Sequence, residues 1–133
     1  MVGVWGAGVR AGMSFMDAEH GQLIGVLIAL EERAVLGDLV ACAGLMGEVR
    51  RTLDAHVAHE NDLMSEHDYP GARAHVAQHA LFSHRLGVLY EDPALVWDPY
   101  RVVEFFQGWW ALHVLDNDRP LARWLANKGL VPA

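Results

Sequence analysis

The chain has 133 residues, 53% apolar and 20% charged, which is typical of one globular domain with a single core. The formal net charge of −7 argues against a nucleic-acid partner, and no apolar run approaches the ~20 residues that a membrane helix needs. The single cysteine, Cys42, excludes an intramolecular disulfide and predicts a reducing, cytoplasmic location without membrane insertion.

Helical periodicity dominates the chain after a glycine-rich start. We expect residues 1–16 to form an irregular N-terminal arm anchored by Trp5. The apolar pattern predicts helices over residues 17–36, 38–67, 70–90 and 98–117, and a C-terminal segment, 118–133, with a short helix over 121–127. Long helices with short connections predict an all-α protein, an antiparallel up-down-up-down four-helix bundle, within a single domain 1–133.

The eight histidines are the unusual feature of the composition, and most of them fall on the apolar helix faces that would meet the core. His56 and Glu60 lie four residues apart, as do His75 and His79, so each pair shares one helix face about 6 Å apart. Counted from the predicted helix ends, six residues lie at one level of the bundle: His20, His56, Glu60, His75, His79 and His113. We expect them to meet in one layer of the core.

The remaining histidines are not expected to join this layer. His59 and His84 lie off the apolar faces and should be solvated. His67 continues its face but follows Glu60 by seven residues, roughly 10 Å along a helix, which is too far to share one metal centre.

A layer of five buried histidines and a glutamate predicts a metal site, because no facing lysine or arginine would neutralise Glu60. Five imidazoles exceed what one zinc or iron ion accepts, which indicates two metal ions. A further carboxylate should come from the fourth helix, where Asp116 and Asp118 are the candidates. Pro120 is expected to bend or break that helix near Arg119, and the pattern alone leaves both aspartates open.

The order and spacing of these residues resemble the hemerythrin family, in particular its stand-alone bacterial form. The resemblance extends from Trp5 to about Leu125 and is carried by four groups of residues: Trp5, Gly12, Asp17 and His20; His56, Glu60 and Met64; Tyr69, Pro70, His75, His79 and Phe82; Trp109, His113 and Asp118. That family has its last carboxylate five residues after the final histidine, which selects Asp118.

The resemblance implies a non-haem di-iron centre with Fe(II) and Fe(III) states. One iron would be held by His75, His79 and His113, and the other by His20 and His56. Glu60, Asp118 and an oxo or hydroxo group would bridge both. The iron with two histidines then keeps one open coordination position, where a small ligand can bind.

The resemblance implies reversible O2 binding, for storage or for delivery to oxygen-consuming enzymes, with NO or small anions such as azide as other ligands. A histidine-rich shell without a spare carboxylate or tyrosine as a catalytic base predicts an oxygen-binding protein rather than an enzyme. The alternatives are a sensor of O2, NO or redox state that acts through a partner protein, and a di-iron peroxidase, oxidase or iron-handling protein. The sequence does not determine the oligomeric state.

Two positions depart from the family pattern. Asn61 stands where a second acid often follows the bridging glutamate, and we expect it to lie outside the coordination shell of the metals. Trp110 replaces a common leucine and is expected to be a packing residue.

Overall fold

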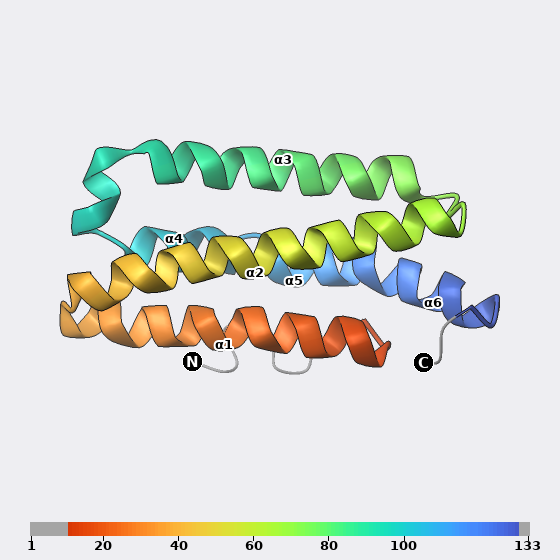
Figure 1. Ribbon diagram of the computed structural model, residues 1–133, viewed down its shortest axis with the longest axis horizontal. Coiled ribbons are helices and arrows are strands. Elements are labelled where there is room, and N and C mark those ends of the chain that lie inside the picture. The colour runs from red at the N-terminus through yellow and green to blue at the C-terminus, as the bar shows by residue number, and fades with distance from the viewer. Residues whose placement is uncertain (1–10, 131–133) are drawn as a thin grey trace.

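The computed structural model describes residues 11–130, and the chain is helical throughout most of that range. The elements are α1 (Ser14–Leu36), α2 (Leu39–Glu66), α3 (Ala72–Glu91), η2 (Pro93–Trp97), α4 (Tyr100–Gln107), α5 (Trp110–His113), η3 (Val114–Asp118) and α6 (Arg119–Asn127). Successive long helices run in opposite directions, and α4, α5 and α6 follow one another as the fourth column (Figure 1). The predicted all-α four-helix bundle with a short C-terminal helix is confirmed.

The start of α1 differs from the prediction, because the helix begins at Ser14 and not at residue 17. Met13 and Met16 are both buried, and the Asp17 carboxylate accepts a hydrogen bond of 2.9 Å from the Ala11 N–H. Apolar burial and this contact together hold the first turn against the bundle. The predicted Trp5 anchor lies outside the described residues.

The tight turn between α1 and α2 follows the sequence signals closely. Gly37 ends α1 in the left-handed conformation, with φ of 74°, and its N–H donates to the Ala34 carbonyl at 3.1 Å. Asp38 then caps α2, where its carboxylate accepts from the Ala41 N–H at 3.2 Å. This short connection sets α1 and α2 side by side. It thereby fixes which residues of α1 lie beside which residues of α2 along the bundle.

The fourth column is not the single regular helix that we predicted. Helix α4 ends at Gln107, and Trp109 leaves helical geometry with φ of −130° and ψ of −36°. The Trp109 ring stacks on Phe82 with ring centroids 3.4 Å apart. Packing of a large aromatic ring here outweighs helix continuity.

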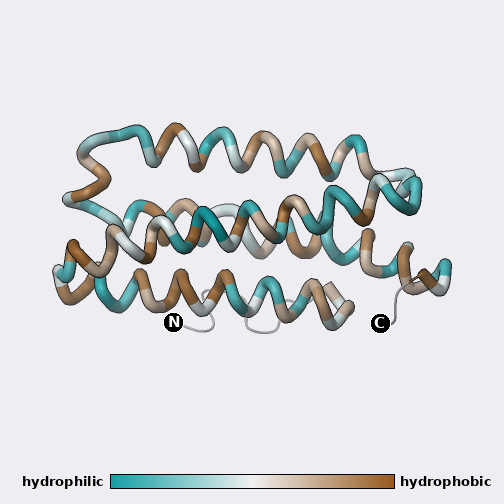
Figure 2. The backbone as a smooth tube through the Cα atoms, in the orientation of Figure 1, coloured by the Kyte–Doolittle hydropathy of each residue, from teal (hydrophilic) through white to brown (hydrophobic). Residues whose placement is uncertain are grey.

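The apolar core is divided into two clusters. The larger one includes Leu23, Leu53, Phe82 and Phe106, and the smaller one includes Met16, Met64 and Leu121. Met64 is buried in the smaller cluster, whereas its neighbour Leu63 is half-buried. Hydrophobic and hydrophilic residues alternate along the helices (Figure 2), and no described helix is long and apolar enough to cross a membrane.

Candidate metal centre

A layer of buried polar side chains lies between the two apolar clusters. All seven predicted site residues are at most 4% exposed and converge in this layer: His20 from α1, His56 and Glu60 from α2, His75 and His79 from α3, His113 from α5, and Asp118 from η3. The excluded histidines behave differently, because His59 and His84 are exposed and His67 is half-buried. Helical register thus brings together residues separated by almost a hundred positions in the chain.

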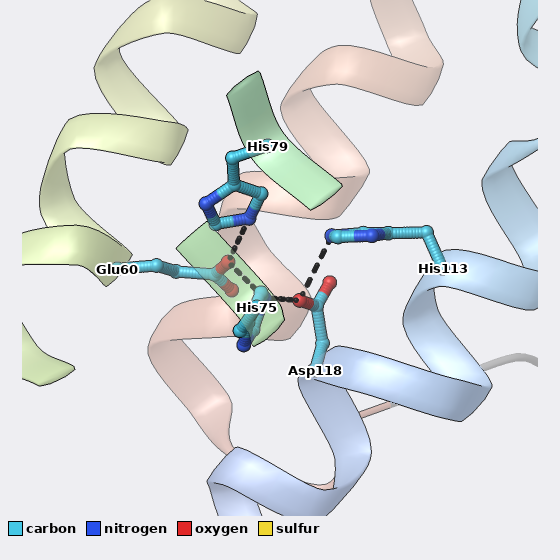
Figure 3. A group of neighbouring side chains, drawn as sticks. All are labelled: Glu60, His75, His79, His113 and Asp118. Atoms are coloured by element: carbon cyan, nitrogen blue, oxygen red, sulfur yellow. Dashed lines mark ion pairs between the residues drawn. The ribbon is translucent and has the colours of Figure 1, made fainter. Parts of the chain in front are cut away.

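The two oxygens of Glu60 face histidines on different sides of the layer. Oε1 lies 3.4 Å from His75 Nε2 and 3.1 Å from His79 Nε2, while Oε2 lies 3.1 Å from His56 Nε2. Figure 3 shows the Glu60 carboxylate between the rings of α3, with its ion pairs dashed. Glu60 therefore contacts histidines of two separate groups.

Asp118 divides its contacts in the same manner. Its Oδ1 lies 3.0 Å from His75 Nε2 and 3.2 Å from His113 Nε2, and its Oδ2 lies 2.9 Å from His20 Nε2. The ligand atoms form two sets, each within 4.8 Å: Glu60, His75, His79, His113 and Asp118; and His20, His56, Glu60 and Asp118. Both carboxylates belong to both sets, and each set has the residue types and spacing of a metal-binding cluster.

A π-helical segment explains how Asp118 reaches the layer. Five residues from His113 would rotate Asp118 about 140° on an α-helix, but η3 is a π-helix, in which the Arg119 N–H donates to the Val114 carbonyl. The wider turn returns Asp118 to the face of His113, whereas Asp116 is exposed. The predicted departure of Arg119 from helical geometry is wrong, since its φ is −63° and its ψ −44°. The π turn accommodates Pro120 without a break.

Many polar atoms in the layer are buried without a hydrogen bond of good geometry. They include both oxygens of Glu60 and of Asp118, and Nε2 of His20, His56, His75 and His79. Such atoms are costly inside a protein unless they coordinate a cation. The histidine contacts lower the pKa of both carboxyls well below the usual range, although burial alone would raise it. The layer thus presents two carboxylates and five imidazoles whose Nε2 atoms converge, which fits a cation.

Outer partners orient two of the imidazoles. The Nδ1 atom of His56 lies 2.6 Å from one Glu19 oxygen, and Nδ1 of His59 lies 2.7 Å from the other. His79 Nδ1 lies 2.8 Å from the Asn61 amide oxygen, so Asn61 contacts this site histidine on the nitrogen that faces away from Glu60. Glu19 was not among the predicted site residues, and its carboxylate lies behind His56 at the edge of the layer. The available signal for Glu19 was its position in the sequence, directly before the site residue His20.

Two indole rings close the layer on its sides. Trp109 stacks on His113 with centroids 4.2 Å apart, and Trp110 meets His20 edge-on at 5.0 Å. Trp110 is 3% exposed, which confirms its predicted packing role. These rings restrict the motion of the two histidines and limit the access of water to the layer.

Comparison with known proteins identifies the family. The chain matches the hemerythrin HHE cation binding domain over residues 11–125. The chain belongs to the hemerythrin family. It is 28% identical over 122 residues to a bacteriohemerythrin from Aquifex aeolicus (strain VF5), a match that covers 89% of this chain and 93% of that protein. No solved structure matches the chain significantly. In a hemerythrin-family chain, the buried histidine and carboxylate cluster indicates a non-haem metal site.

Metal uptake by the metal-free protein should release protons. Burial lowers the pKa of His56 and His75, but contacts with carboxylates outweigh it and raise both pKa values to about 9. These carboxylates are Glu60 and Glu19 at His56, and Asp118 and Glu60 at His75. Both rings are therefore protonated at pH 7 and must lose a proton to bind a metal. We expect about two protons per chain from these rings. Calorimetric zinc titrations in buffers of different ionisation enthalpy measure this number.

The number of protons released on metal binding should fall as the pH rises through 9, because the His56 and His75 rings are then already neutral. The same raised pKa values stabilise the metal-free fold fully below the ordinary histidine pKa of about 6.5. That stabilisation is lost as the pH rises through about 9. A proton release that is close to zero at pH 7 would contradict the protonated state of His56 and His75.

Proposed function

We propose that this chain holds two iron ions in the buried layer and binds O2 reversibly, for storage or for delivery to oxygen-consuming enzymes. The division of the carboxylate oxygens carries the proposal, since Glu60 and Asp118 each direct one oxygen to each group of histidines. Two carboxylates placed between two ligand sets suit a pair of bridged metal ions better than one ion.

The unequal number of histidines supports a site for a small ligand. His75, His79 and His113 would complete six ligands with Glu60, Asp118 and an oxo or hydroxo bridge, whereas His20 and His56 leave one position open on the second iron. Bound iron would supply the electrons that reversible O2 binding requires. The residues of the chain hold the metals, orient the imidazoles and, through the indoles of Trp109 and Trp110, restrict water.

Reversible colour change tests this function. Iron-loaded protein reduced under nitrogen should become coloured in air and bleach when O2 is removed, and absorption spectra over repeated cycles measure the reversible fraction. Zinc-loaded protein is the control and should remain colourless, because Zn²⁺ has no redox chemistry. Irreversible oxidation of the iron within seconds would contradict O2 carriage. Steady-state turnover of peroxide would favour a di-iron enzyme instead, and specific binding of a signalling protein would favour a sensor.

A further inference from the structure

The two halves of the centre have outer partners of different charge. His56 contacts the Glu19 carboxylate, and His79 contacts the Asn61 amide. The Nδ1 atoms of the other three imidazoles have no hydrogen-bond partner within residues 11–130: His20, His75 and His113. His56 belongs to the group with two histidines and His79 to the group with three. A negative partner therefore stands behind one half only, and a neutral partner behind the other.

Glu19 is held in place from two sides. Its two oxygens lie 2.6 Å from His56 Nδ1 and 2.7 Å from His59 Nδ1, and both histidines come from α2, whereas Glu19 comes from α1. His59 is 44% exposed and Glu19 27% exposed, so the pair lies at the edge of the layer. His59, although not placed in the layer, restricts the Glu19 carboxylate to an orientation that suits His56.

The charge of the outer partner changes how well an imidazole binds a metal. An imidazole that binds a cation through Nε2 keeps its proton on Nδ1 and donates it outward. A carboxylate acceptor makes a hydrogen bond roughly twice as strong as a neutral acceptor does, and it increases the electron density that the ring offers to the metal. When Nε2 of His56 is bound to a metal, the ring cannot carry a proton from Glu19 to the site. We therefore expect Glu19 to affect how strongly the metal is bound.

We propose that Glu19, clamped by His59, is a positioning residue that strengthens the metal position of His20 and His56 and offsets its smaller number of histidines. Asn61 leaves the position of His75, His79 and His113 without a comparable charge. The inference rests on the proposed two-metal centre. It adds that the metal affinities of the two positions differ because one has a charged outer residue, Glu19, and the other a neutral one, Asn61. The carboxylate half should also stabilise the higher oxidation state of its metal, because a nearby negative charge favours the more positive ion.

Two charge-swapping variants of matched shape test the proposal. Metal-free wild type, Glu19→Gln and Asn61→Asp are titrated with Co²⁺ in the presence of a competing chelator, and visible absorption reports each binding step. Glu19→Gln should weaken one step by roughly 10–100-fold and leave the other unchanged. Asn61→Asp should strengthen the other step. In iron-loaded protein, Glu19→Gln should raise the reduction potential and Asn61→Asp should lower it. A packing defect would not shift the metal affinities and reduction potentials of the two variants in opposite directions.

His59→Ala and His84→Ala provide the matched histidine controls. His59→Ala should weaken the same step as Glu19→Gln but by less, with two metals still bound at saturation, and the exposed His84→Ala should change neither step. The inference would be overturned if Glu19→Gln left both Co²⁺ binding affinities unchanged or weakened both of them equally. Loss of O2 reversibility with the expected Co²⁺ behaviour would overturn only the proposed function. A wild-type chain that binds a single metal would overturn both.

Discussion

Replacing Glu60 with alanine should remove most of the bound metal and destabilise the fold at the same time. Glu60 is fully buried and contacts three histidines from two helices, so the variant leaves both ligand sets incomplete. Removing one partner of a buried charged cluster costs about 3–5 kcal/mol, and lost metal binding adds to this cost because metal binding and folding are coupled. Metal content by elemental analysis and the free energy of unfolding in urea measure both effects.

Asp62→Ala is the control for this prediction, since Asp62 lies on the same helix but is exposed. We expect it to retain the metal content and to change stability by less than about 0.5 kcal/mol. The same metal content in Glu60→Ala and wild type would show that Glu60 does not hold the metals. A loss of stability without a loss of metal would assign it a purely structural role.

Replacing Asp118 with asparagine should reduce the bound metal to less than half of the wild-type content, whereas Asp116→Asn should leave it unchanged. Asparagine preserves the shape of the side chain but removes the negative charge that meets His20, His75 and His113. Asp118 is fully buried and Asp116 is exposed. Elemental analysis of both variants after iron loading, with helix content by circular dichroism, distinguishes ligand loss from unfolding.

This pair also tests the role of the π-helical segment, because only the wide turn of η3 directs Asp118 toward the histidines. Metal loss in Asp116→Asn with normal content in Asp118→Asn would mean that the segment adopts a regular α-helical turn in the metal-loaded protein. The opposite result would support the two carboxylate bridges that we propose.

The spacing of residues within each helix determined much of the site in advance. A separation of four residues places His56 with Glu60, and His75 with His79, on one face of any α-helix. Connections such as Gly37–Asp38 require neighbouring helices to run antiparallel, so their levels in the bundle follow from counting residues. Local geometry and short loops therefore suffice to predict the fold class and the convergence of the layer.

The tertiary structure decided the features that depend on contacts between helices or on departures from regular geometry. Helical counting assumes a constant rotation per residue, so it could not select Asp118, which the π turn places, or foresee the interruption at Trp109. Counting also gives no account of what lies behind a ligand. Glu19 on α1 meets His56 and His59 on α2 only because the two helices pack at this register. Sequence spacing describes one helix at a time, whereas the partners of an imidazole are set by the packing of several.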